Sequence, residues 1–149
     1  MIYNCIDKNV IENIILHPKV MLWLTDDNSK NYAVIIHPQV KYLVNEEHTG
    51  VIRVDPMNSI TCSLHMATLP ELWGHGYEFA TEALEWGFKN TLYQKIVAII
   101  PAYNERIIKL VQKMNFKQEG ILTKSFLKNW VLVDQLIFSL NKGDFLCQC

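Results

Sequence analysis

Residues 64–77 decide the fold, and they read Leu64-His65-Met66-Ala67-Thr68-Leu69-Pro70-Glu71-Leu72-Trp73-Gly74-His75-Gly76-Tyr77. The first part continues an alternation of apolar and polar side chains, which predicts a strand. Gly74 and Gly76 predict a tight turn, after which a helix opens. Such a turn directs backbone N–H groups and the positive end of a helix dipole at one spot, where a phosphate group would fit.

The shape of this turn suits an anion, but its charge does not. The loop contains no Lys or Arg, and Glu71 and Glu78 work against an anionic ligand. His75 would add positive charge only when protonated. The same two glycines also suit a plain strand-to-helix turn with no ligand, so both interpretations stay open.

The composition is that of one globular domain, which we expect to span residues 1–149. A net charge of −1 argues against a general nucleic-acid binder. No apolar run reaches the ~18 residues that a membrane helix needs, and the first residues lack the features of a signal peptide. We therefore expect a cytoplasmic protein without nucleic-acid or membrane partners.

The four cysteines match no zinc-binding pattern, so we expect no metal site. Cys62 lies in an apolar alternation and is expected to be a small core residue. Cys147 and Cys149 could chelate a metal, but a frayed tail with free thiols is the preferred interpretation.

The first half of the chain predicts helices followed by three antiparallel strands. Asp7 or Asn9 can cap a first helix, and Pro18 either ends it or begins a second one. The predicted strands are Val40–Asn45, Gly50–Val54 and Ser59–Thr68, with Asp55 in the turn before the third. On the third strand, His65 shares the polar or small face that could meet a ligand.

The second half predicts a strand–helix–strand–helix segment and a closing hairpin. The helix after the glycine turn has an apolar stripe that begins at Phe79, and a buried strand follows at Ile96–Ile100. Asn104 can cap the next helix, which Asn115 can end. The hairpin comprises Gly120–Leu127 and Trp130–Leu140. A strand–helix–strand unit requires a parallel pair, so the fold class is a mixed α/β sheet.

Three stretches resemble the GNAT superfamily of N-acetyltransferases over about residues 40–140. Leu69–Tyr77 is similar to the family's acetyl-CoA pyrophosphate loop, and Asn104–Phe116 is similar to its Asn-initiated helix. Glu119–Asp134 is similar to its last strand pair. Ser125–Asn129 and Val133–Gln135 also resemble a small group of bacteriophage-encoded GNAT-like proteins, some described as virion or head-assembly proteins.

The resemblance implies a mostly antiparallel twisted sheet with a central, splayed parallel strand pair and flanking helices. It also implies that acetyl-CoA lies between the splayed strands and that a primary amine attacks its thioester. The cofactor-binding residues that it implies are Ala67, Thr68, Trp73, Gly74, His75, Gly76, Tyr77 and Asn104.

The chain departs from the family in the loop and in the helix. In the loop, Trp73 stands where the family usually has an Arg or Gln and Glu78 stands at its final small position, which weakens the expected cofactor binding. In the helix, Asn115 replaces a Gly without consequence, because Asn also tolerates the left-handed conformation. Val111 stands where many members have a Tyr that protonates the leaving thiolate, and Val cannot donate a proton. Tyr103 is a candidate substitute acid, although packing alone explains an aromatic residue there.

His65 is the candidate general base, because imidazole suits proton transfer near neutral pH. A half-buried structural histidine is the alternative, as a simple helix cap is for Asn104.

These features predict an acetyl-CoA-dependent N-acetyltransferase whose acceptor is a small-molecule or protein amine. One alternative is a catalytically inactive GNAT-shaped assembly module, which could act as a homodimer or in a phage particle. Another is a CoA-binding regulator that keeps the pocket but lacks the chemistry.

Overall fold

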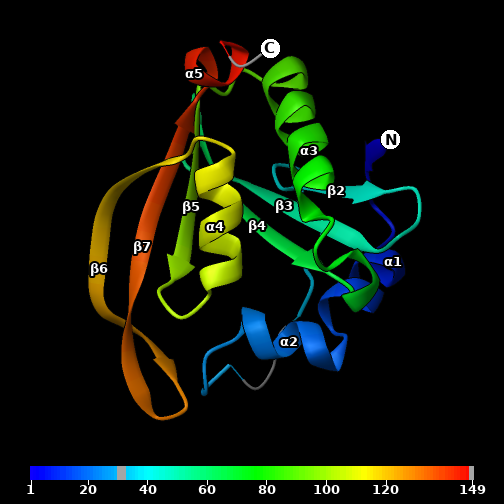
Figure 1. Cartoon of the computed structure of the whole chain (residues 1–149). Coiled ribbons are helices and arrows are strands. Elements are labelled where there is room, and N and C mark those ends of the chain that lie inside the picture. Colours follow the sequence, from blue (N-terminus) through cyan, green and yellow to red (C-terminus); the bar gives the residue numbers. More distant parts are fainter. Residues whose placement is uncertain (30–32, 148–149) are drawn as a thin grey trace.

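The computed structural model describes residues 1–29 and 33–147. Its centre is a seven-stranded sheet with the strand order β1-β2-β3-β4-β5-β7-β6 (Figure 1). The strands are β1 (Ile2–Asn4), β2 (Lys41–Asn45), β3 (Gly50–Pro56), β4 (Thr61–Thr68), β5 (Lys95–Pro101), β6 (Lys117–Lys128) and β7 (Val131–Asn141). The predicted α/β class, mostly antiparallel with one parallel pair, is confirmed.

The antiparallel half of the sheet is a meander in which β2, β3 and β4 pair in sequence order. β1 adds to the outer side of β2, a strand that the sequence did not reveal because it contains three residues. The placement of Asp55 in a turn was wrong. Asp55 lies in β3 opposite Ser63, and its neighbour Arg53 lies opposite His65.

β4 and β5 form the parallel pair, and they separate soon after they meet. Their register pairs Thr61–Ser63 with Lys95–Val97 and stops there. In Figure 1 the two arrows point apart toward their carboxyl ends. Beyond Ser63, no described strand pairs with the side of β4 that faces β5. The backbone of Leu64–Thr68 therefore presents a strand edge toward the gap.

Helices cover both faces of the sheet and form two cores. α3 (Gly76–Asn90) and α4 (Glu105–Lys113) pack on one face, where Phe138, Leu84 and Ile96 are buried, as is Cys62 as predicted. α1 (Lys8–Ile15) and α2 (Pro18–Leu24) pack on the other face with Ile11, Ile14 and Val44.

Local capping signals explain where these helices begin. Asp7 accepts a hydrogen bond from the Asn9 N–H, and Asn104 accepts one from the Ile107 N–H at 3.5 Å. Pro18 begins α2 rather than ending α1. Asn115, with φ 61°, ends α4 in the left-handed conformation as predicted.

The C-terminal hairpin of β6 and β7 extends past β5 toward α2 (Figure 1). A short helix, α5 (Lys142–Leu146), follows where the sequence predicted only a tail, and Phe145 packs on Phe88 of α3. Cys147 is an exposed free thiol, and the predicted Cys147–Cys149 alternative reaches outside the described residues. Among the described residues, no cluster has the composition of a metal site, and no helix has the length and hydropathy to cross a bilayer.

Candidate functional site

A cavity of about 390 Å³ opens where β4 and β5 separate. One side of it comes from β4, β5 and α4, which contribute His65, Ile100, Asn104 and Val111. The facing side comes from α2, β6 and β7, which contribute Trp23, Leu24, Leu122, Phe126 and Gln135. The parting of two neighbouring strands thus creates an internal space next to an unpaired strand edge.

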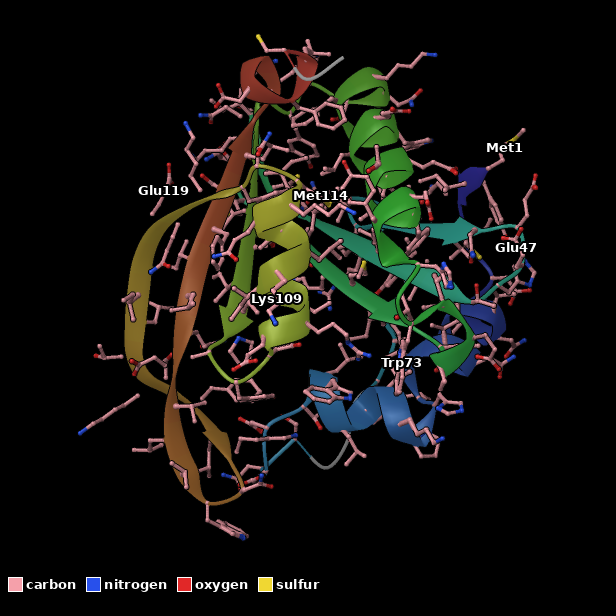
Figure 2. All side chains as sticks on the ribbon, in the orientation of Figure 1. Met1, Glu47, Trp73, Lys109, Met114 and Glu119 are labelled. Atoms are coloured by element: carbon pink, nitrogen blue, oxygen red, sulfur yellow. The ribbon has the colours of Figure 1, made fainter. Side chains whose placement is uncertain are left out.

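A smaller cavity of about 50 Å³ continues along the end of β4. Its lining includes Ala67, Thr68, Trp73, Asn104 and Arg106. The indole Nε1–H of Trp73 donates to the Thr68 carbonyl over 3.1 Å, which holds the ring against the strand end. In Figure 2, Trp73 lies between the segment that precedes α3 and α2. The structure therefore brings together four of the predicted cofactor residues, namely Ala67, Thr68, Trp73 and Asn104.

The glycine turn has the backbone shape that its sequence predicts. A single turn of 3₁₀ helix at Pro70–Leu72 leads to Gly74, whose φ of 87° favours glycine. Gly76 begins α3, and a Cβ added there would make only ordinary contacts, the nearest at 3.6 Å to Met66. Since the first N–H groups of a helix have no partner inside it, those of α3 are available to an anion.

The structure supplies cations to this turn from α4, which sequence reasoning missed. The Arg106 guanidinium carbon lies 4.6 Å from the Trp73 ring centroid and 5.6 Å from that of Trp23. The Lys113 Nζ lies 4.2 Å from the Tyr77 ring centroid in the first turn of α3. Arg106 and Lys113 are seven residues apart, and Lys109 lies between them at a spacing that puts all three on one side of the helix. The sequence shows the seven-residue spacing of these cations, but it does not show that they lie on the rings of Trp73 and Tyr77.

His65 lines the larger cavity beside a carboxylate on the neighbouring strand. Its Nε2 lies 3.6 Å from Asp55 Oδ2, and its side chain is 56% exposed. Asp55 Oδ1 accepts from Arg53 Nη2 at 2.8 Å and Nε at 3.0 Å. Asp55 Oδ2 is buried and accepts no hydrogen bond from a described residue. The carboxylate is thus held by Arg53 with one oxygen turned to the imidazole.

The environment keeps His65 neutral. Partial loss of solvent around the imidazole, which stays about half exposed, lowers its pKa below 6.5; Asp55 opposes this shift and Arg53 adds to it. A neutral imidazole at pH 7 can accept a proton, and the carboxylate beside it favours the imidazolium that then forms. The sequence alone did not place Asp55 beside His65. If β3 is extended by two residues beyond Arg53, which lies opposite His65, Asp55 falls on the same face of the sheet.

The remaining predicted residues are distributed differently. Gly74, His75, Gly76 and Tyr77 line neither of these two cavities. The His75 side chain borders a separate hollow together with Glu71, Glu78 and Glu82.

Tyr103 lies outside both linings, with ring centroids 6.2 Å from Trp23 and 6.1 Å from Phe126. Its Oη is buried without a hydrogen-bond partner among the described residues, and burial raises its pKa, so it is a weak acid.

The comparison with protein families agrees with this architecture. The family described as the acetyltransferase (GNAT) domain matches residues 8–117. The chain belongs to the GNAT family. An uncharacterized N-acetyltransferase of Bacillus subtilis (strain 168), YoaA, is 29% identical over 76 residues, which cover 50% of this chain and 43% of that protein. The match thus spans less than half the length of that relative.

Solved structures show the same fold at low sequence identity. The spermidine N-acetyltransferase of Vibrio cholerae, solved in complex with CoA and spermine, superposes with a TM-score of 0.82 at 16% identity, covering 98% of this chain and 97% of that one. A ribosomal-protein-S5-alanine acetyltransferase from Vibrio fischeri gives 0.75 at 17% identity, covering 97% and 93%. At such identities the likeness establishes the fold.

GNAT acetyltransferases use acetyl-CoA as the acyl donor, and the residues of this chain suit that molecule. The unpaired edge of β4 offers peptide groups to an amide-containing arm. The N-terminus of α3 offers N–H groups to a diphosphate, and Arg106 adds a positive charge close by.

Proposed function

We propose that this protein is an acetyl-CoA-dependent N-acetyltransferase that acts on a primary amine. The observation that carries the proposal is the position of His65. β4 places this imidazole in the cavity just beyond the last pair between β4 and β5. A proton acceptor therefore lies at the strand edge along which the thioester arm would run.

Three parts of the chain would hold the acyl donor. The edge of Leu64–Thr68 pairs with the amides of the pantetheine arm, and Asn104 borders the same channel. The N–H groups at the start of α3 bind the diphosphate. Arg106 and Lys113 provide the positive charge that the loop itself lacks, and the aromatic rings of Trp73 and Tyr77 support them.

The chemical step then needs one base. The amine nitrogen forms a bond to the thioester carbonyl carbon, and the C–S bond breaks with its electron pair remaining on sulfur. One amine proton passes to Nδ1 of His65, the ring nitrogen that does not face Asp55, and the Asp55 carboxylate beside Nε2 stabilises the resulting imidazolium. That proton is then available to the departing thiolate, which Val111 cannot protonate.

Two measurements test this proposal. Acetyl-CoA should raise the melting temperature, because a ligand at 100 times its Kd adds about 2.7 kcal/mol of stability. Thiol release from acetyl-CoA should depend on an added primary amine, and His65→Gln should abolish most of this release while leaving the melting shift in place.

The outcomes separate the candidate functions. Binding of acetyl-CoA without amine-dependent thiol release would support a CoA-binding regulator instead. Absence of binding at millimolar acetyl-CoA would contradict both enzyme and regulator and leave a non-catalytic assembly module. Unchanged turnover in His65→Gln would remove His65 from the mechanism.

A further inference from the structure

The acceptor side of the large cavity is built from α2, β6 and β7, and its two α2 residues also line the smaller cavity. Trp23 and Leu24 come from α2, Leu122 and Phe126 from β6, and Gln135 from β7. In Figure 1, α2 lies across the space between β4 and the β6–β7 hairpin. An amine reaching the region of His65 from this side would contact these residues.

The walls of this side are apolar and carry no negative charge. Gln135 and the Trp23 indole are the polar groups that α2, β6 and β7 contribute to the lining. Among the described residues, no Asp or Glu lines the cavity, and residues 30–32, 148 and 149 include no acidic residue in the sequence. An ammonium group buried here would lack a counter-ion, which is costly.

Charges of both signs lie near this side, namely the cations of Lys128 and Arg106 and the carboxylates of Asp26 and Asp27. Lys128 Nζ donates to the carbonyl oxygens of Leu22 and Thr25, and it lies 5.9 Å from the Tyr103 ring centroid. Arg106 lies over Trp23 at 5.6 Å. The Trp23 ring, which lines the cavity and could attract a ligand cation, therefore already holds a cation of the protein itself.

The carboxylates of the nearby loops accept hydrogen bonds that hold those loops together. Asp27 accepts from the N–H groups of Asn129 at 3.1 Å and Trp130 at 2.7 Å, which ties the hairpin turn to the segment after α2. Asp26 accepts from the Asn28 N–H and the Ser29 hydroxyl. Asp55 is held by Arg53.

From this arrangement we infer that the acceptor is a primary amine with a single nitrogen on an apolar alkyl or aryl body, and not a polyamine. The inference rests on the proposed function. The lining receives the apolar body, and it offers no carboxylate to a second ammonium group. The same surroundings favour the neutral, nucleophilic form of the acceptor amine, because burial in an apolar lining lowers an amine pKa.

The acceptor thus differs in charge from spermine, the polyamine bound in the Vibrio cholerae structure. The shared fold does not imply the same substrate, because the side chains of α2, β6 and β7 that line the cavity determine which amine is accepted.

A matched pair of acceptors tests the inference. Butylamine and 1,4-diaminobutane have the same carbon chain and differ by one ammonium group. We expect kcat/KM for butylamine to exceed that for the diamine by about tenfold or more, and each added methylene in pentylamine and hexylamine to raise it about fourfold. Spermidine should be acetylated more slowly than hexylamine.

A charge variant links the preference to the wall. Phe126→Glu places a carboxylate in the lining, so the ratio of diamine to monoamine kcat/KM should rise at least tenfold. Leu132→Glu is the control, because Leu132 is 57% exposed on the same hairpin and lies outside the lining. Its ratio should stay at the wild-type value.

The outcomes distinguish failure of the acceptor inference from failure of the acetyltransferase proposal. A preference for spermidine or 1,4-diaminobutane in the wild type would overturn the acceptor inference and leave the acetyltransferase function standing. Equal changes in Phe126→Glu and Leu132→Glu would also overturn it. Binding of acetyl-CoA without transfer to any amine would overturn the enzyme proposal and the acceptor inference together.

Discussion

Replacing Arg106 with alanine tests whether α4 supplies the positive charge that the glycine turn before α3 lacks. The loop carries Glu71 and Glu78 and no Lys or Arg, whereas the Arg106 guanidinium lies 4.6 Å from the Trp73 ring centroid. Trp73 is itself held by the Thr68 carbonyl. If this stack positions the guanidinium for the diphosphate, its removal should weaken acetyl-CoA binding.

The expected loss follows from the strength of a charge-assisted hydrogen bond. Such bonds contribute about 1.5–3 kcal/mol. Because Arg106 is exposed, solvent and salt screen it, and we expect the lower end of this range. A loss of about 1.5 kcal/mol raises the Kd for acetyl-CoA about tenfold. Arg106→Lys keeps the charge but loses the planar guanidinium, so its Kd for acetyl-CoA should lie between those of the wild type and Arg106→Ala.

Calorimetric titration with two ligands isolates the diphosphate. Acetylpantetheine contains the thioester arm but no diphosphate, so its affinity should be unchanged in Arg106→Ala. Lys89→Ala is the matched control, because Lys89 lies in the last turn of α3, about 20 Å along the helix from its first residues. Melting without ligand measures the loss of the two ring contacts, about 0.5–1 kcal/mol each.

Two results would refute this reasoning. An unchanged Kd for acetyl-CoA would show that the guanidinium does not contact the diphosphate. An equal loss of affinity for acetyl-CoA and acetylpantetheine would show that the variant disturbs the channel instead. A genuine charge effect should also shrink at 1 M salt, where the screening length falls to about 3 Å.

Four further predictions concern His65, its neighbour Asp55 and the glycine turn. His65→Gln should lower kcat by about 10²–10⁴-fold and remove the acid limb of the pH–rate profile, which in the wild type lies below pH 6.5 because burial lowers the imidazole pKa. The same lowered pKa makes the wild type lose stability as the pH falls below 6.5, a loss that His65→Gln should reduce in acid melting curves. Asp55→Asn should move the acid limb to still lower pH, since Asp55 raises the His65 pKa; a limb that stays in place would show that the two groups are uncoupled. Gly74→Ala should lower the free energy of unfolding by about 1–2 kcal/mol because its φ is positive, whereas Gly76→Ala should change stability little; equal melting temperatures of the two would contradict the strained turn.

Local chemistry made much of the fold predictable. The strand, glycine turn and helix of residues 61–90 follow from alternation, a positive φ and an apolar stripe, all of which act between near neighbours. The caps at Asp7 and Asn104 and the left-handed Asn115 are equally local. Each of these predictions is confirmed.

Short elements were not predictable, because distant partners stabilise them. β1 has three residues and exists through its pairing with β2, supported by the Asn4 side chain, which accepts from the Tyr42 N–H. α5 has five residues, and Phe145 ties it to Phe88. Asp55 looked like a turn residue because a proline follows it, yet β3 continues through Pro56 by pairing with β4.

The sequence by itself determined the parallel strand pair and the glycine turn, since these depend on patterns of near neighbours along the chain, and it predicted His65 as a candidate base. Only the tertiary structure decided what surrounds them. It placed Arg106 on Trp73, Asp55 beside His65, and Lys128 at the rim of the acceptor side. The reason is that electrostatic interactions depend on distance in space, and packing brings together charges that the chain order keeps apart.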